Sequence, residues 1–305
     1  MPAKMNGRAI LIAGPTASGK SATALFLAER LGGVVVNADS MQVYRDLRIL
    51  TARPSPDEEA QVPHVLYGHV DAAVRHSAGR WLEEARVEAA RIMAEGRVPI
   101  FTGGTGLYFR VLEEGIAEVP EVPEALRREI AALEVSDLRA RAQALGLDAE
   151  LDRQRLVRAL TVRLATGRRL EEFHGSGGLP GLPSGTEVLR LFIAPDREKL
   201  VRRIARRFGE MLEQGAVEEV ERLLARRLDP SLPVMKAHGV RNIAAALRGE
   251  ISMEEAAQGA ITETRQYAKR QMTWARRFMR AWTWAEDAAS AAETGLALAR
   301  ERDWC

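Results

Sequence analysis

The sequence predicts an α/β fold in which a parallel sheet is joined to a mostly helical insertion and a helical C-terminal region. Short, almost continuously apolar segments alternate with amphipathic segments in the first third of the chain, which is typical of a parallel sheet covered by helices on both faces. A glycine-rich loop joins the first of these strands to the first helix. A further apolar strand comes only after a long helical stretch, so we expect an insertion to interrupt the sheet.

The individual elements follow from this alternation and from the lengths of the apolar runs. After the last apolar strand, the chain reads as helical to its end. In chain order the expected elements are a strand at 8–13, a helix at about 20–31, a strand at 33–37, a helix at about 80–95, and strands at 97–101 and 188–194.

The chain is expected to divide into three stretches. Residues 1–116 form the first part of the core, 117–187 form the helical insertion, and 188–305 complete the core with a helical, basic C-terminal region. A linker rich in Gly, Pro and Ser, at 174–185, marks the end of the insertion, because such residues favour loops over helices and strands.

The first loop, GPTASGKS at 14–21, has the glycine and lysine spacing of a P-loop, and it lies between an expected strand and helix. The core is therefore expected to be P-loop NTPase-like. In such a loop, backbone N–H groups and the positive end of the helix converge on an anion. The lysine adds a charge and the serine hydroxyl can coordinate Mg²⁺. The loop residues expected to bind phosphate are Gly14, Pro15, Thr16, Ala17, Ser18, Gly19, Lys20 and Ser21.

The second strand ends in VVVNADSMQVY, which puts Asp39 at the carboxyl edge of the sheet, beside the P-loop. An aspartate there can be a Mg²⁺ ligand, as in P-loop ATPases. It can also be a general base that faces a substrate nucleophile. Both interpretations place Asp39 in the active site.

Two further loops are open to two interpretations each. Thr51 and Arg53 lie in a proline-interrupted loop that is either an ordinary surface loop or part of the site. Residues 103–106, Gly-Gly-Thr-Gly, open another helix. They can present backbone donors and the Thr105 hydroxyl to an anion, or the glycines can serve only a tight turn.

Composition favours a soluble, cytoplasmic enzyme. Apolar residues make up 46% and charged residues 28%, and no apolar run approaches the ~18 residues of a membrane span or the length of a signal-peptide core. The only cysteine, Cys305, excludes an intramolecular disulfide and a cysteine-based zinc site. The five histidines show no HxxxH-type pairing on a helix, so a transition-metal enzyme is not expected.

Net charge is only +2, but the basic excess is concentrated near the C-terminus, where residues 261–282 carry six basic side chains and one acidic one. Such a segment can face the phosphates of a nucleic acid. It can also be an ordinary helix with buried aromatics and solvated charges. We expect both, with the aromatics mainly inward and the basic residues mainly outward. The aromatic residues are Tyr267, Trp274, Phe278 and Trp282, and the basic residues between and beside them include Lys269, Arg270, Arg276, Arg277 and Arg280.

At this point the sequence resembles a known family, the tRNA dimethylallyltransferases, also called tRNA isopentenyltransferases. The resemblance runs in the family's order from residue 10 to about residue 275. It rests on GPTASGKS (14–21), ADSMQVY (38–44), TARP (51–54), GGTGLY (103–108), QRLVRAL (154–160), TGRRL (166–170) and TRQYAKRQMTW (264–274).

The resemblance implies a chemistry for these motifs. The P-loop would hold the diphosphate of dimethylallyl diphosphate with Mg²⁺, for which Ser21 is the expected protein ligand, and would stabilise the charge that builds on the leaving group. Asp39 would be the base that takes a proton from an adenine amine. Thr105 would lie near the reaction centre, and Arg207 would bind the diphosphate.

It also implies contacts with the anticodon stem-loop of tRNA, which should make binding strongly salt-dependent. One departure concerns Val240, which stands where family members commonly have a tyrosine, between Gly239 and Arg241. The residues expected to contact tRNA are Asp39, Ser40, Met41, Gln42, Thr105, Arg127, Gln154, Arg155, Leu156, Val157, Arg158, Arg241, Lys269 and Arg270.

The activity that the resemblance implies is transfer of a dimethylallyl group to the adenosine immediately 3′ of the anticodon, in tRNAs that read codons starting with U. Two other classes use the same P-loop: a small-molecule kinase that binds ATP, and a nucleic-acid-stimulated ATPase. The third strand ends in IFTGG without a carboxylate, which disfavours the ATPase. Nothing in the sequence requires a dimer, and we expect a monomer.

Overall fold

The computed structural model describes residues 7–173 and 177–304, and it divides into two compact units. The core unit combines the chain up to Glu114 with the chain from Gly181 onward, and the inserted unit is Gly115–Pro180. His174 and Cys305 lie outside the described residues, as does part of the expected linker at 174–185.

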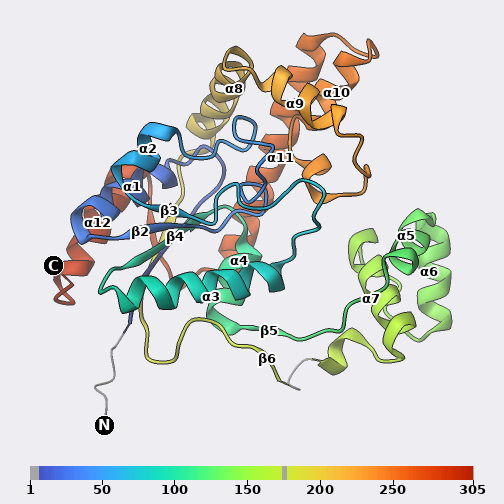
Figure 1. Ribbon diagram of the computed structural model, residues 1–305, viewed down its shortest axis with the longest axis horizontal. Coiled ribbons are helices and arrows are strands. Elements are labelled where there is room, and N and C mark those ends of the chain that lie inside the picture. Colours follow the sequence, from blue (N-terminus) through green and yellow to red (C-terminus); the bar gives the residue numbers. More distant parts are fainter. Residues whose placement is uncertain (1–6, 174–176, 305) are drawn as a thin grey trace. The chain divides into compact units, whose positions relative to one another are not determined.

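The core unit is built on a six-stranded sheet in which every pair of neighbouring strands is parallel (Figure 1). The strand order is β3-β2-β4-β1-β7-β8. Because all strands run the same way, the loops that follow them gather at one edge of the sheet. The strands are β1 (Arg8–Ala13), β2 (Val34–Asn37), β3 (His64–Val65), β4 (Pro99–Gly103), β7 (Glu187–Ile193) and β8 (Thr283–Ala285).

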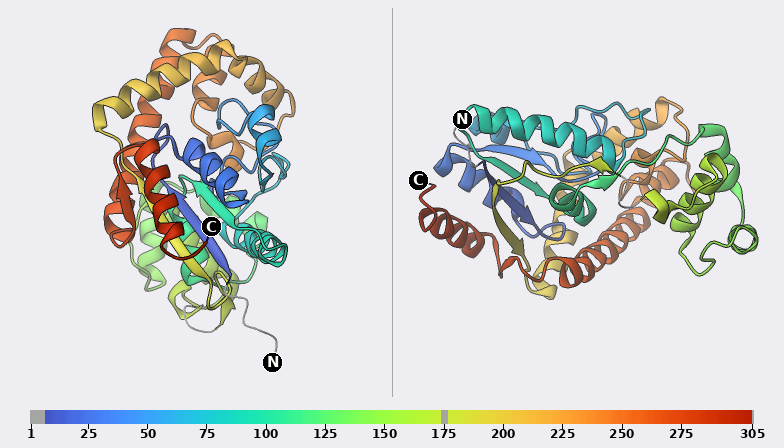
Figure 2. Two further views of the ribbon diagram at one scale, coloured as in Figure 1. Left: turned by 90° about the vertical axis from the view of Figure 1, so that its left-hand side faces the viewer. Right: turned by 90° about the horizontal axis from the view of Figure 1, so that it is seen from below.

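Helices pack on both faces of this sheet, which confirms the expected α/β class. On one face α1 contacts β4 and β2, and α12 contacts α1 and β7. On the other face α3 contacts β4, and α4 contacts β1 and α3 (Figure 2). The helices of the core unit are α1 (Lys20–Leu31), α2 (Pro56–Gln61), α3 (Ala78–Ala94), α4 (Gly106–Glu114), α8 (Arg197–Glu213), α9 (Ala216–Ala225), α10 (Val240–Leu247), α11 (Met253–Phe278) and α12 (Ala288–Arg300), with a 3₁₀ turn at Pro233–Lys236.

The apolar strand residues form the core that fixes these layers. Ile10, Ile12 and Ile100 lie in one cluster with Leu27 of α1 and Leu191 of β7, all fully buried. Across the sheet, buried aromatics hold α3 and α4 together, with Trp81 stacked on Tyr108 at a ring separation of 4.1 Å. Side chains on both faces of the central strands are therefore buried, which is why these strands are apolar almost throughout.

The inserted unit is helical and has a core of its own. Fully buried side chains from α5, α6 and α7, among them Ile130, Leu138 and Leu160, pack together. A short antiparallel pair, β5 with β6, joins the beginning of this unit to its end. Its elements are β5 (Ile116–Ala117), α5 (Glu124–Ala132), α6 (Val135–Ala144), α7 (Arg153–Thr166), a 3₁₀ turn at Leu170–Phe173, and β6 (Gly178–Leu179).

One part of the predicted element order is wrong. The chain after β7 is not helical throughout, because β8 adds a parallel edge strand beside β7, pairing Trp284 with Phe192. Three residues are too few to show a period of two, so this strand leaves no pattern in the sequence. Of the described helices, none combines the length and the apolar character that a membrane span requires.

Candidate active site at the carboxyl edge of the sheet

The P-loop joins β1 to α1, and its glycines are required by its geometry. A Cβ on Gly14 would come within 2.6 Å of the Ser18 Oγ and 2.9 Å of the Ile193 carbonyl oxygen. Gly19 has φ +97° and Ala17 has φ +60°, both in the left-handed region. The Ser18 N–H donates to the Pro15 carbonyl, 3.2 Å away, and closes the turn. Such a turn before a helix directs backbone N–H groups toward an anion.

Lys20 lies among charges that come from distant parts of the chain. Its Nζ donates to the Pro15 carbonyl at 3.3 Å. Burial lowers the pKa of Lys20 to about 8, the charge of Asp39 opposes that shift, and the charge of Arg207 adds to it. The folded chain therefore brings Lys20 of the P-loop near Asp39 and Arg207, two of the residues predicted for the reaction centre.

Asp39 is held in place by Asn37, the last residue of β2. The buried Asn37 side chain accepts from the Asp39 N–H at 2.9 Å and donates to the Asp39 carbonyl at 3.0 Å. The Asp39 Oδ1 in turn accepts from the Met41 N–H at 2.9 Å. A Cβ on Gly104 would lie 3.3 Å from the Asp39 Oδ2. One carboxylate oxygen is thus used by the loop, and the other faces the glycine-rich loop after β4.

The glycine-rich loop after β4 packs directly on the loop after β2. A Cβ on Gly103 would lie 2.0 Å from the Ala38 carbonyl oxygen. The Thr105 N–H donates to the same carbonyl at 3.4 Å, and its Oγ1 accepts from the Ser40 N–H at 3.0 Å. The close approach explains the glycine at 103, and it fixes the Thr105 hydroxyl beside the segment that carries Asp39.

Gln271 of α11 is a buried polar residue to which the sequence had assigned no role. Its Oε1 accepts from the Thr16 N–H of the P-loop at 3.0 Å, and its Nε2 donates to the Gly104 carbonyl at 2.8 Å. Gln271 lies between the buried residues Ala268 and Ala275 on the apolar face of α11. A glutamine on the apolar face of a helix is the sequence signal that could have identified it.

The same helix explains the remaining glycines of the β4 loop. A Cβ on Gly104 would lie 2.2 Å from the Gln271 Nε2, and one on Gly106 would lie 2.3 Å from the Trp274 ring. Burial, followed by the charge of Asp39, raises the pKa of Tyr267 on the same helix, against the hydrogen-bonding influence of Thr105 and Gln271. Helix α11 is therefore a wall of the site as well as a basic helix.

A cavity of about 450 Å³ opens beside the helix end of the P-loop. Arg207 is one of its basic residues, and burial lowers the pKa of this guanidinium, against the charges of Glu210 and Asp39. Arg53 also lines it, so the loop around Thr51 belongs to the site region. The charged and hydroxyl residues around the cavity include Ser21, Arg48, Arg53, Glu58, Arg207 and Glu210.

Two unforeseen contacts hold the 48–54 loop in place. The buried Glu219 of α9 accepts from the N–H groups of residues 48, 49 and 50, at 2.6, 2.8 and 2.9 Å. The Gln42 amide donates to the carbonyls of Thr51 and Ala52, at 2.9 and 2.8 Å. Gln42 therefore ties the loop after β2 to the cavity wall.

The residues expected to contact tRNA lie on both units. In the core unit, Arg241 is the second residue of α10, and Lys269 and Arg270 lie on α11. All three are exposed. Arg270 lies over the Tyr267 ring, 5.6 Å from its centroid. Val240, where the family commonly has an aromatic residue, is buried in the core.

In the inserted unit, Gln154, Arg155 and Arg158 are exposed on α7. Although the Arg158 side chain is exposed, partial desolvation of its guanidinium lowers its pKa. The charge of Arg127, on α5, adds a smaller shift in the same direction, so the two side chains are near one another. Leu156 is fully buried in the helical core, and the partly buried Val157 packs against the same cluster. The seven-residue motif at 154–160 therefore contains both core and surface residues, and its exposed side chains are the ones available to a binding partner.

The aromatics of α11 and the turn after it mostly point inward. Trp282 is buried and Tyr267 and Trp274 are half-buried. Phe278 is the exception, 40% exposed, with the Arg277 and Arg110 guanidiniums over its ring. The basic residues of this segment, Arg265, Lys269, Arg270, Arg276, Arg277 and Arg280, are all exposed.

Comparison with known proteins links this arrangement to one family. A family model described as IPP transferase matches residues 42–278, and one described as isopentenyl transferase matches residues 7–67. The tRNA dimethylallyltransferase of Nitrobacter hamburgensis is 52% identical over 293 residues, covering 90% of each chain. That of Methylobacterium nodulans is 53% identical over 290 residues, covering 92% of this chain and 95% of the relative.

Solved structures agree with these sequence relatives. The crystal structure of the full-length tRNA isopentenylpyrophosphate transferase of Bacillus halodurans matches with a TM-score of 0.70 at 28% identity, covering 97% of each chain. A eukaryotic dimethylallyltransferase, captured acting on tRNA, matches with a TM-score of 0.79 at 25% identity, covering 97% of this chain and 79% of that one.

Proposed function

Because the chain belongs to the tRNA dimethylallyltransferase family, we propose that it transfers a dimethylallyl group from dimethylallyl diphosphate to a tRNA adenosine. The acceptor is the exocyclic amine of the adenosine immediately 3′ of the anticodon, in tRNAs that read codons starting with U. The product is N6-isopentenyladenosine. The observation that carries the proposal is that Gln271 joins the P-loop, which carries Lys20, to the glycine-rich loop that faces the Asp39 carboxylate.

The P-loop binds the diphosphate. Its turn, with Gly19 and Ala17 in the left-handed region, directs N–H groups toward the start of α1, where the helix dipole also favours an anion. Lys20 adds its charge, and Arg207 supplies a second cation from α8. These fixed donors stabilise negative charge as it develops on the leaving group, which is where preorganised electrostatics contribute most to a rate.

The residues beside this loop suit Mg²⁺. Ser21 is exposed, lines the cavity and offers a hydroxyl oxygen, and Mg²⁺ prefers oxygen ligands and keeps waters and substrate phosphates in its shell. Ser21 would hold the ion together with diphosphate oxygens. When bound, Mg²⁺ would neutralise charge on the diphosphate.

Asp39 accepts the proton that the reaction releases. The allylic C–O bond breaks and its electron pair leaves with the diphosphate, while the adenine nitrogen forms the new bond to carbon. The amine proton moves to the Asp39 carboxylate. The bracing of Asp39 by Asn37 and Met41 supports this role, because a base must be within hydrogen-bond reach of its proton and held there.

Exposed basic residues position the tRNA. In this proposal the exposed Arg241, Lys269 and Arg270 of the core unit and the exposed Arg158 of the inserted unit contact phosphates. Arg127, which is half-buried beside Glu124, contributes its charge from the same unit. Ser40, Met41, Gln42 and Thr105 contact the target nucleotide, which must leave its stack to reach Asp39. The enzyme works in the cytoplasm as a monomer.

Two unmodified tRNA transcripts that differ only at the nucleotide 3′ of the anticodon, adenosine in one and guanosine in the other, test the acceptor position. Each is incubated with the protein, Mg²⁺ and dimethylallyl diphosphate, digested and analysed by mass spectrometry. We expect one prenyl unit on the adenosine transcript alone. Equal prenylation of both would move the acceptor to another nucleotide.

A further inference from the structure

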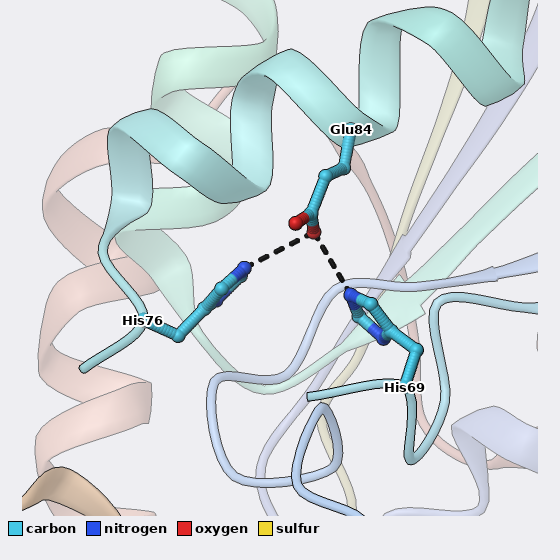
Figure 3. Close-up of side chains that lie close together, drawn as sticks. All are labelled: His69, His76 and Glu84. Carbon is cyan, nitrogen blue, oxygen red and sulfur yellow. Dashed lines mark hydrogen bonds and ion pairs between the residues drawn. The ribbon is translucent and has the colours of Figure 1, made fainter. Parts of the chain in front are cut away.

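Two histidines and a glutamate converge on one point of the core unit, and the proposed reaction uses none of them. His69 and His76 come from the segment between β3 and α3, and Glu84 comes from the second turn of α3 (Figure 3). The Glu84 Oε2 lies 2.9 Å from the His69 Nε2 and 3.0 Å from the His76 Nε2. The three ligand atoms lie within 4.8 Å of one another.

The backbone on each side of this group is fixed. Glu84 projects from a 17-residue helix whose first turn is capped by Ser77, the residue after His76. On the other side, the N–H groups of Gly68 and Val70 donate to the carbonyls of residues 42 and 43, both at 2.9 Å. A site built on such supports loses little freedom when a ligand binds.

The donor set is one that transition metals use. Two neutral imidazoles and a carboxylate, with a fourth position open to water, form a common zinc site. The His76 side chain is 3% exposed, whereas His69 and Glu84 are 31% and 36% exposed, so water can reach the open side of the group. Metal–ligand distances of about 2.0–2.2 Å put tetrahedral ligand atoms roughly 3.3 Å apart, so the observed N···O separations need to open by only a few tenths of an ångström.

Coordination through Nε2 also agrees with the hydrogen bonding of the rings. The Nδ1 of His76 is buried and has no hydrogen-bond partner among the residues that the structure describes, so moving the proton from Nε2 to Nδ1 breaks no other contact there. In the metal-bound form the His76 Nδ1 carries a proton, and no carboxylate or carbonyl among the described residues accepts it. The affinity for zinc should therefore be lower than at sites where a second residue accepts this proton.

We propose that His69, His76 and Glu84 bind a transition-metal dication such as Zn²⁺, and that the ion fastens the 66–76 segment to α3. The same segment pairs through its backbone with residues 42–45, so the ion would add a second, side-chain link to a segment that the backbone already holds. A search for histidine pairs on one helix does not detect this site, because both histidines lie in a loop and only Glu84 lies on a helix.

The test is a calorimetric titration of the metal-free full-length protein with Zn²⁺ in excess Mg²⁺. A Cys305→Ser background removes the one thiol that could bind zinc elsewhere. We expect one Zn²⁺ per chain, and a Kd weakened at least about tenfold by His69→Ala and by Glu84→Gln, since loss of a ligand exceeds the effect of a lost outer partner. The exposed neighbour Glu83→Gln is the matched control and should keep the Kd of the background protein.

Cobalt supplies a second readout that a change in folding would not imitate. Co²⁺ bound in the tetrahedral site should give intense visible absorption, which His69→Ala and Glu84→Gln lose and Glu83→Gln keeps, with all three variants giving the same circular dichroism. No binding of Zn²⁺ or Co²⁺ by the background protein would overturn the proposal. Equal binding by all variants would overturn it too, because the ligands would then lie elsewhere.

Discussion

Asp39 is the residue on which the proposed chemistry depends most. Asp39→Asn keeps an oxygen to accept from the Met41 N–H, so the loop should stay folded while the base is lost. We expect the rate of prenyl transfer in a single turnover to fall roughly 10²-fold or more, the usual contribution of a general base. The exposed Asp57→Asn is the control. An Asp39→Asn enzyme with an unchanged rate would mean that another group takes the proton.

Gln271 makes a second prediction at the residue scale. Gln271→Leu leaves the Thr16 N–H and the Gly104 carbonyl without their buried partner, which should cost about 1–3 kcal/mol of unfolding free energy for each group. It should also raise the KM for dimethylallyl diphosphate, because the P-loop loses a support. Gln266→Leu, at an exposed position of the same helix, should change neither. Denaturant unfolding and steady-state kinetics measure both effects, and a variant with normal stability and KM would show that this bridge is dispensable.

At the scale of elements, α9 holds the cavity wall through one carboxylate. Glu219 accepts three consecutive N–H groups of the 48–54 loop, and Glu219→Gln replaces one of its acceptor oxygens with a donor that faces other donors. We expect a loss of about 1–3 kcal/mol of unfolding free energy, measured by urea denaturation. Glu218→Gln, exposed on the same turn, is the matched control. Equal stability of the two variants would contradict the anchoring role.

Local patterns predicted the long elements well. The strand at 8–13 and the helix at 20–31 have the predicted bounds, because an apolar run and a glycine at each helix end define them. Helix α3 begins at residue 78, two residues before the predicted start, since Ser77 supplies the cap. The strands β3 and β8 have two and three residues, and they form only because a longer neighbour offers its edge.

The same distinction applies to the site. The P-loop, Asp39 and Thr105 belong to short contiguous motifs, so the sequence could indicate them. Gln271 meets Thr16 across 255 positions, and Glu219 meets residue 48 across 171. A motif or a helical period can mark Gln271 as buried, but its partner depends on how α11 packs against the P-loop, which no local pattern encodes.

At the scale of the whole molecule, we propose that residues of both units bind tRNA. The electrostatic contribution of each basic residue to this binding can be measured separately through its salt dependence. Arg158→Ala should weaken tRNA binding and reduce the slope of log K against log salt by roughly one contact, while the affinity for dimethylallyl diphosphate stays unchanged. Arg139→Ala, exposed on α6 of the same unit, is the control. Filter binding over a salt series measures the slope. An unchanged slope would remove Arg158 from the tRNA surface.

The central claim is that the P-loop serves prenyl transfer to tRNA. The most direct test is mass spectrometry of nucleosides from unmodified tRNA incubated with the protein and Mg²⁺, with dimethylallyl diphosphate in one tube and ATP in another. A gain of one five-carbon unit on adenosine, in the first tube only, is the result we predict. No gain there, with ATP consumed in the second tube, would contradict it and make the protein a P-loop kinase or ATPase.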